Sequence, residues 1–220
     1  AQPVEWRAGI GWATLDLSSA YRSVFDTMLP KAVQVADPFH VVQLANRALD
    51  ECRRRVQNET LGHRGRRDEP LYRARRRLVM AAERLTGEQH ERLMGLLRVG
   101  DPHREVWFAW NGKEVVRQIY DHTDPALAGE WVDAIGRDFT DQEMPIEVRR
   151  LGRTITKWRD QIVAWHSSHV SNGPTEAINN LVKRVKRVAF GMRNFAHYRI
   201  RALLYAGRPN WSLLPTITPP

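Results

Sequence analysis

A lone acidic side chain, Glu176, stands at the start of a strongly basic carboxyl-terminal segment. Residues 171–176 read SNGPTE, where Thr175 is expected to cap a helix, and the basic run AINNLVKRVKR follows at 177–187. Residues 171–220 carry eight Lys and Arg side chains, and Glu176 is their only acid. Cations bind a polyanionic backbone, while a carboxylate among them can hold the Mg²⁺ that acts on a phosphate. The alternative is an ordinary acid in the first turn of a helix, followed by solvated cations.

A second candidate, Asp16, closes a short apolar run at residues 10–15. We expect this run to form a buried strand, which places Asp16 at its carboxyl end. Two carboxylates such as Asp16 and Glu176 could hold two Mg²⁺ ions about 4 Å apart, which activates the attacking oxygen of a phosphodiester reaction and stabilises the leaving oxygen. The alternative for Asp16 is a strand-end aspartate that caps the following helix.

The residues around Asp16 alternate between strand and helix patterns. A helix capped by Ser18 or Ser19 is expected next, then a strand at 32–36, and then a second helix after Asp37. Strands that alternate with helices pair in parallel, and ligands of such sheets bind beyond the carboxyl ends of the strands. Asp16 and Asp37 are both expected at that edge.

From about residue 53 the pattern changes from alternating strands to helices. The triple arginine at 53–55 and the stretch 62–70 predict a basic, flexible connector, because Gly, Pro and like charges cannot form a core. Further helices are expected roughly at 71–85, 88–99, 102–120, 125–139 and 145–165. Aromatic residues that recur on their apolar faces are expected in the core: Trp107, Phe108, Trp110, Trp131, Phe139, Trp158 and Trp165.

The composition points to a polyanionic partner. The 220 residues carry a formal charge of +9, distributed as −1, +6, −3 and +7 over residues 1–50, 51–100, 101–170 and 171–220. Two basic regions that face one ligand would form a clamp, and double-stranded DNA is the first candidate.

The cysteine count and the hydropathy indicate the cellular compartment. A single cysteine, Cys52, excludes an internal disulfide framework and fits a reducing compartment. No apolar run reaches the roughly 18 residues of a membrane span, and no signal peptide opens the chain. We expect a cytoplasmic protein with no membrane partner.

Four short motifs, in this order, resemble the catalytic region of the DDE transposases of bacterial insertion sequences, and most closely the ISL-three family. They are LDLSSAYR at 15–22, VQVADPFHVVQL at 33–44, SNGPTEAINN at 171–180 and GMRNFAHYR at 191–199. The resemblance implies an α/β fold: a partial RNase H-like catalytic core interrupted by a large all-α insertion. Core segments are expected at 1–52 and 169–220, and the insertion at 53–168.

The resemblance also implies roles for individual residues. Asp16 matches the second acid of the catalytic triad and Glu176 the third, with Mg²⁺ as the cofactor or Mn²⁺ in its place. Asp37 and His40 match the C/D-x-x-H signature that follows the second acid, where they could support the metal site or the DNA end. The alternative is that Asp37 caps a helix and His40 packs beneath it.

Further residues after Glu176 are expected to meet the phosphates of DNA, and the alternative for them is a solvated basic face. They are Lys183, Lys186, Arg187, Arg193, Asn194, Tyr198 and Arg199. Phe195, in their midst, is expected in the core.

The chain departs from the family's pattern at the first acid of the catalytic triad. That acid lies on an opening strand, and only Glu5, in a poorly matching context, precedes Asp16. We therefore expect the carboxyl-terminal part of a transposase, inactive by itself, without the first catalytic Asp and without the family's amino-terminal DNA-recognition segment. The intact, nucleoid-associated enzyme would cut DNA at insertion-sequence ends and join the freed 3′ hydroxyl to target DNA, as a homo-oligomer. The alternatives are a non-catalytic DNA-binding remnant of a decayed element and a basic helical RNA-binding protein.

Overall fold

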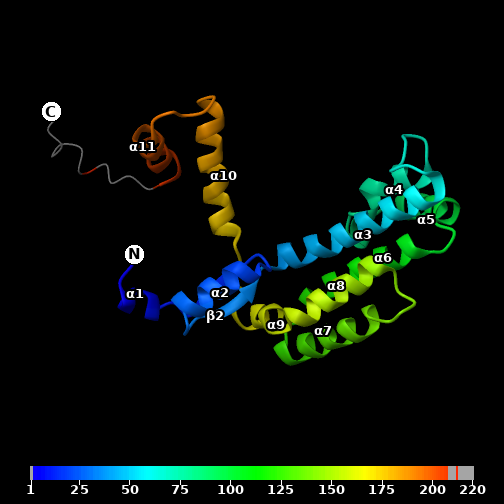
Figure 1. Ribbon diagram of the computed structural model, residues 1–220, viewed down its shortest axis with the longest axis horizontal. Helices are drawn as coiled ribbons and strands as arrows, with labels where there is room; N and C mark the ends of the chain where they lie inside the picture. Colours follow the sequence, from blue (N-terminus) through cyan, green and yellow to red (C-terminus); the bar gives the residue numbers. More distant parts are fainter. Residues whose placement is uncertain (1, 208–211, 213–220) are drawn as a thin grey trace. The chain divides into compact units, whose positions relative to one another are not determined.

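The computed structural model describes residues 2–207 and Ser212. The chain forms two compact units, Ala1–Ser171 and Asn172–Pro220. The described residues are mostly helical, with one small parallel sheet in the first unit (Figure 1). None of the helices among these residues combines the length and the apolar character that crossing a membrane requires.

The sheet consists of β1, Trp12–Leu15, and β2, Val33–Ala36. The strands pair in parallel, with Trp12 opposite Val33 and Leu15 opposite Ala36. The short helix α1, Val4–Ala8, precedes β1, and α2, Ser19–Met28, connects the two strands. The predicted order of strand, helix, strand and helix and the predicted parallel pairing are therefore confirmed.

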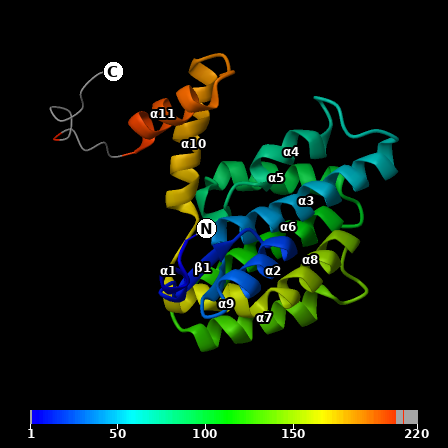
Figure 2. The ribbon, with the colours of Figure 1, turned by 60° about the vertical axis from the view of Figure 1, so that its left-hand side comes forward.

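The long helix α3, Pro38–Leu61, forms the spine of the first unit. Asp37 caps its start, and it ends at Gly62, whose φ of 73° is left-handed and suits glycine. Its buried apolar face recurs every three or four residues and consists of Val41, Ala45, Leu49, Cys52 and Val56. This face packs against α6, Glu105–Gln118, and α8, Ile146–Lys157, which lie beside α3 in Figure 2.

The prediction of a flexible connector at 53–55 is wrong. Arg53, Arg54 and Arg55 lie within α3, because the apolar spacing continues through Val56 and holds that turn against the core. Arg53 is buried, and Arg55 is bonded to acids of two other helices. The helix thus continues through the position at which the sequence places a domain boundary; the boundaries at 52/53 and 168/169 stay predictions.

Among the described residues, four more α-helices complete the first unit: α4, Pro70–Leu78; α5, Gly87–Gly100; α7, Pro125–Phe139; and α9, Arg159–Ser168. Two short 3₁₀ turns, η1, Ala82–Arg84, and η2, Ile119–Asp121, lie between them in the chain. α4 packs on α5, α7 on α8 and α9, and α9 on β2. The helix expected at 71–85 ends at Leu78, and the helix expected at 145–165 is interrupted at Trp158, which is buried between α8 and α9.

Only some of the aromatic residues predicted in the core are buried. Trp110, Phe139 and Trp158 are buried as predicted. Trp107, Trp131 and Trp165 are half-buried. Phe108 is 38% exposed, so its expected place in the core is wrong; on α6 its position lies off the buried face that Val106, Ala109 and Trp110 form.

The second unit contains α10, Gly173–Val188, and α11, Phe195–Ala206, which pack against each other. α10 begins before the expected cap Thr175, because Pro174 has the fixed φ and the missing N–H that suit a first turn. Phe195, expected in the core, is 75% exposed. A two-helix hairpin buries only the strip between its helices, and Phe195 lies at the very start of α11.

Candidate catalytic edge and nucleic-acid interface

The carboxyl ends of β1 and β2 form one edge of the sheet. The backbone N–H of Asp37, directly after β2, donates to the carbonyl of Leu15, the last residue of β1, at 3.3 Å. Asp16 follows Leu15 in the chain. The parallel pairing therefore places Asp16 and Asp37 at the same edge, where the alternation of strands and helices predicts them.

Asp37 is engaged in the backbone of α3. Its Oδ1 accepts a hydrogen bond from the N–H of Phe39 at 2.8 Å, and only 4% of the residue is exposed. Pro38 occupies the first helical position, where its missing N–H leaves no donor unpaired. The geometry is that of the capping alternative, so Asp37 fixes the direction of the first turn of α3; a role at a metal site stays a prediction.

His40, in that first turn, reaches the neighbouring strand end. Its Nε2 lies 3.1 Å from Oδ1 of Asp16, and the two side chains are 18% and 43% exposed. The imidazole is held edge-on by the Phe39 ring, with centroids 5.3 Å apart. His40 is therefore paired with Asp16 rather than packed beneath Asp37, and the carboxylate of Asp16 remains accessible from solvent.

The turn after Asp16 is held in an uncommon conformation. Leu17 has a φ of 51°, in the left-handed region that residues other than glycine seldom adopt. Its side chain packs against the hydrophobic core, which holds this backbone in place. The chain therefore turns sharply just beyond the candidate catalytic carboxylate.

An aromatic and histidine cluster lies behind this edge, and the sequence reasoning missed it. The Tyr120 ring stacks on His166 at 5.9 Å between centroids and meets Trp165 edge-on at 5.3 Å. Burial, and then the negative charge of Asp37, raise the pKa of Tyr120. Burial lowers the pKa of His166, whose Nδ1 lies 2.9 Å from the carbonyl oxygen of His122. The recurrence of His and aromatic residues at 120–122 and 165–169 is the sequence signal that could have indicated the cluster.

The chemistry of the edge fits Mg²⁺ only in part. A carboxylate oxygen is a ligand that Mg²⁺ prefers, and Asp16 presents one that solvent can reach. Across residues 2–207 and Ser212, however, no three His, Cys, Asp or Glu side chains gather as a metal site. Asp16 is therefore suited to supply one ligand of a set that the described residues leave incomplete.

Glu176 lies in the first turn of α10, as predicted from its place after Asn-Gly-Pro. It belongs to the second unit and Asp16 to the first, so their pairing at one metal site stays a prediction.

The basic side chains predicted to bind DNA follow Glu176 on α10. Lys183, Lys186 and Arg187 are exposed and spaced by three and four residues, so they share a helical face. In the part of the chain that the structure describes, none of them forms an ion pair. This face suits a ligand with regularly spaced negative charges.

The turn and helix that follow have partly structural roles. Asn194 caps α11, since its Oδ1 accepts from the N–H groups of Ala196 at 2.9 Å and His197 at 3.3 Å. Arg193 is exposed beside it. Tyr198 and Arg199 line an apolar groove of about 320 Å³ on the hairpin. The assignment of these four residues to DNA contacts stays a prediction.

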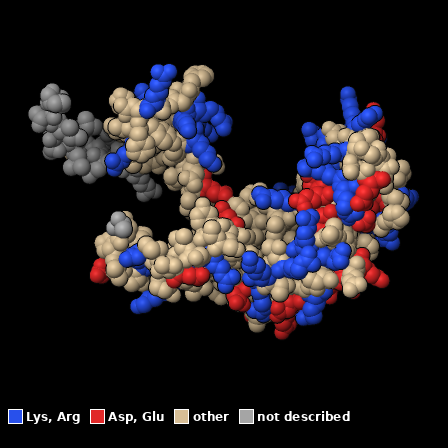
Figure 3. Space-filling view, viewed as in Figure 1, with Lys and Arg blue, Asp and Glu red and all other residues tan. Residues whose placement is uncertain are grey.

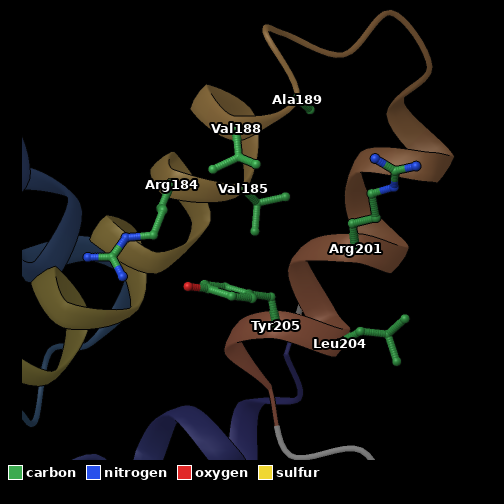
Figure 4. A pocket seen from close by; sticks show the side chains of 7 residues that line it. All are labelled: Arg184, Val185, Val188, Ala189, Arg201, Leu204 and Tyr205. Atoms are coloured by element: carbon green, nitrogen blue, oxygen red, sulfur yellow. The ribbon is translucent and has the colours of Figure 1, made fainter.

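A second groove, of about 430 Å³, lies between α10 and α11. Figure 4 shows Val185 of α10 and Tyr205 of α11 at the space between the helices, with Arg184 and Arg201 labelled at its sides. Its lining is mainly apolar, because the facing strips of two amphipathic helices meet here. The sequence interpretation predicts DNA contacts and a buried Phe195 for this hairpin but not the groove.

Comparison with known proteins identifies relatives that match most of the chain. Residues 1–202 match the family model described as Transposase, for the DDE transposases of the ISL-three type. The chain is 28% identical over 213 residues to the transposase for insertion sequence element IS1557 in two strains of Mycobacterium tuberculosis, CDC 1551/Oshkosh and ATCC 25618/H37Rv. Each match covers 86% of this chain and 46% of the relative, so the chain spans about half the length of these relatives.

Another similarity is short. A Lactococcus lactis protein named as an ATP-dependent protease is 34% identical over 64 residues, which is 29% of this chain and 21% of that protein. No solved structure matches the chain significantly.

Proposed function

We propose that this chain, which belongs to the ISL-three family of DDE transposases, forms part of the catalytic region that cuts and joins double-stranded DNA at insertion-sequence ends. The observation that supports this best is the Asp16–His40 pair, an accessible carboxylate at the carboxyl end of a parallel strand with its orientation fixed by an imidazole at 3.1 Å. In this proposal the two-stranded sheet belongs to an RNase H-like core, and the helices between α3 and α9 form the insertion.

Asp16 and Glu176 would hold Mg²⁺, or Mn²⁺ in its place. A metal held there would supply activation of the attacking oxygen and stabilisation of the leaving oxygen of the phosphodiester. A third acid would come from a part of the transposase outside residues 1–220.

His40 acts on Asp16 as a positioning residue. Its Nε2–H donates to Oδ1 of the carboxylate, and the Asp37 cap holds the turn from which His40 projects. Partners of this kind orient a ligand, and their loss typically lowers metal affinity or activity by about 10- to 100-fold. The exposed cations of α10 would hold the DNA backbone, because their charges lack partners within the described residues.

The test uses a longer transposase that contains this chain, with duplex DNA carrying the element's ends. Asp16→Asn and Glu176→Gln should abolish Mg²⁺-dependent cleavage and leave DNA binding nearly unchanged, because the acids serve chemistry. His40→Ala should reduce cleavage by about 10- to 100-fold and raise the Mg²⁺ concentration needed for half-maximal rate. Asp160→Asn, at a side chain that is 84% exposed, is the matched control and should cleave normally. Full activity of Asp16→Asn or Glu176→Gln would refute the assigned catalytic residues.

A second candidate is a DNA-binding remnant without catalysis. One observation favours it: the described residues contain no complete set of metal ligands. The same assay separates the two, because a remnant binds DNA yet shows no metal-dependent cleavage when the longer protein is intact.

A further inference from the structure

A strongly basic groove lies at the α4–α5 end of the first unit. Its volume is about 860 Å³. The arginines that line it come from the loop before α4, from α4 and from α5: Arg67, Arg73, Arg75, Arg76, Arg77 and Arg92. Asp68 is the one acid in the lining. Lys and Arg side chains gather over this end in the space-filling view (Figure 3).

These arginines differ from those elsewhere in the unit. Arg55, Arg117 and Arg159 each bond to carboxylates of other helices or turns, at 2.5 to 2.9 Å. Among the described residues, no arginine of the groove has such an ion pair. Like charges held together repel one another, so a cluster of six arginines with a single acid favours binding of an anion.

The helix dipole explains only part of this cluster. Cations in the last turn of α4, such as Arg76 and Arg77, are favoured by the negative carboxyl end of the helix. That effect does not reach Arg67, in the preceding loop, or Arg92, on a different helix. The helix dipole therefore does not explain why arginines from three segments converge at this groove.

The walls of the groove are fixed by buried polar contacts. The fully buried Lys113 donates from Nζ to the carbonyls of Leu78 at 2.9 Å and Met80 at 2.6 Å, which anchors the end of α4. In the loop, Glu69 accepts from the N–H of Arg66 at 2.6 Å and pairs with His63 at 3.2 Å. The arginines of α4 are thus presented on a helix whose carboxyl end is anchored.

α3 runs from the candidate catalytic edge to the loop that leads into this groove. The Asp16–His40 pair lies at the start of α3, and the loop leading into α4 begins at its end. The 24 residues of α3 span about 36 Å at 1.5 Å per residue. A B-form duplex rises about 3.4 Å per base pair, so this distance equals about 10 base pairs, or one turn.

We propose that the α4–α5 arginine groove binds the phosphate backbone of duplex DNA within about one helical turn of the bond near Asp16. This inference rests on the proposed function for the identity of the nucleic acid, and it adds a second anchor to the cations of α10. The contacts are made to phosphates rather than to bases, so the groove contributes affinity without sequence preference.

The first test measures binding of a 24-base-pair duplex by the 220-residue chain, using fluorescence anisotropy between 50 and 200 mM salt. The groove variant carries Arg73→Gln, Arg76→Gln and Arg77→Gln, which removes three charges and leaves Arg75 bonded to Tyr72. The control variant removes the same charge at three exposed sites outside the groove: Arg98→Gln, Arg137→Gln and Arg153→Gln.

The log–log salt slope of the groove variant should be shallower by up to about 2.7, since each lost phosphate contact removes roughly 0.9. Across that salt range the wild-type affinity should fall about 40-fold more than that of the groove variant. The control should change the slope by less than about 1. Equal slopes for the groove and control variants, or tighter binding of duplex RNA than of duplex DNA, would overturn the proposal.

The second test locates the contact. In the longer transposase bound to an element end, hydroxyl-radical footprinting should show backbone protection within about 10 base pairs of the cleaved bond, and the groove variant should lose it. Protection unchanged in the groove variant would overturn the proposal.

The variant Lys183→Gln, Lys186→Gln, Arg187→Gln separates this inference from the proposed function. If only that variant weakens binding, the α10 interface stands and the groove assignment fails. If the groove variant weakens binding while Asp16→Asn cleaves normally, the groove stands and the catalytic assignment fails.

Discussion

Replacing Arg55 with Met should destabilise the first unit strongly, because this side chain joins three helices. From α3, its Nε and Nη2 donate to the two carboxylate oxygens of Glu147 on α8, at 2.9 and 3.1 Å. Nη2 also donates to Glu105 on α6 at 2.5 Å. A fourth contact, to Glu59 at 2.9 Å, stays within α3. Met keeps most of the apolar stem of the side chain and removes all of these bonds.

The magnitude follows from how far each carboxylate is buried. The Glu147 side chain is 4% exposed, and leaving a buried charge without its partner costs about 3–5 kcal/mol. Glu59 is 56% exposed, so its pair contributes at most about 0.5 kcal/mol. We expect a loss of about 3–4 kcal/mol, which corresponds to a fall in Tm of about 6–16 °C for a domain of this size.

Urea and thermal unfolding at pH 7, followed by circular dichroism, measure this loss. The matched control is Arg54→Met, because the Arg54 side chain is 52% exposed and pairs with Asp50 within α3; it should cost less than about 1 kcal/mol. Adding Glu147→Gln to Arg55→Met should recover part of the loss, since no buried charge is then left unpaired. A free energy of unfolding for Arg55→Met within 1 kcal/mol of the wild type would refute the stabilising role assigned to the bonds from Arg55 to Glu147 and Glu105.

Because of the Arg55–Glu147 pair, we expect the stability of the first unit to fall in acid. Burial opposes ionisation of Glu147, but the hydrogen bonding from Arg55, a backbone hydrogen bond and the charges of Arg55 and Arg150 together outweigh it and hold the pKa of Glu147 below its ordinary value of 4.5. A carboxyl whose pKa is lower in the folded state stabilises the fold above its unfolded pKa, and this contribution is lost as the pH falls through the folded pKa. When the free energy of unfolding is measured from pH 7 to pH 3, it should therefore decrease once the pH is lower than about 4.5. The free energy of unfolding of Arg55→Met should decrease less steeply in that range.

Three further outcomes follow from the helical block. Limited trypsin digestion of the chain should cut first within 62–69, and a first cut inside α3 would contradict the helix there. Lys113→Met should cost about 1–3 kcal/mol in urea unfolding because two buried carbonyls lose their donor, and unchanged stability would refute that role. Gly152→Ala should lower the thermal stability by about 1–3 kcal/mol, since a new Cβ would lie 2.7 Å from Cβ of Phe139. Gly95→Ala, which meets no atom within 4 Å, is its control and should be neutral or slightly stabilising.

The candidate catalytic edge was predictable because its signals are local. Each strand is a short apolar run that ends at an acid, and each helix begins at a recognisable cap or proline. Parallel pairing then follows from the alternation, which brings Asp16 and Asp37 to one edge. Asp37 also illustrates the limit, since the sequence left its carboxylate equally suited to ligand binding and to capping.

Contacts between distant residues were not predictable in the same way. The bond from Arg55 to Glu147 joins residues 92 positions apart, and no local pattern specifies it. The pairing of His40 with Asp16 depends on the angle at which α3 leaves the sheet, which the Asp37 cap sets. The sequence interpretation of 53–55 failed for a related reason: it weighed the charges of the three arginines and overlooked the apolar spacing that continues beneath them.

The position of the carboxylates therefore separates the arginines that stabilise the fold from those that can bind a ligand. Arg55 and Arg76 both lie in arginine runs, but only Arg55 meets acids from other helices. Partly buried pairs such as Arg55–Glu147 are screened little by salt, whereas exposed cations on a phosphate backbone are screened strongly. Raising the salt concentration should consequently release DNA while the helical block stays folded. If binding and folding were instead lost over the same salt range, the division of the arginines into two roles would be wrong.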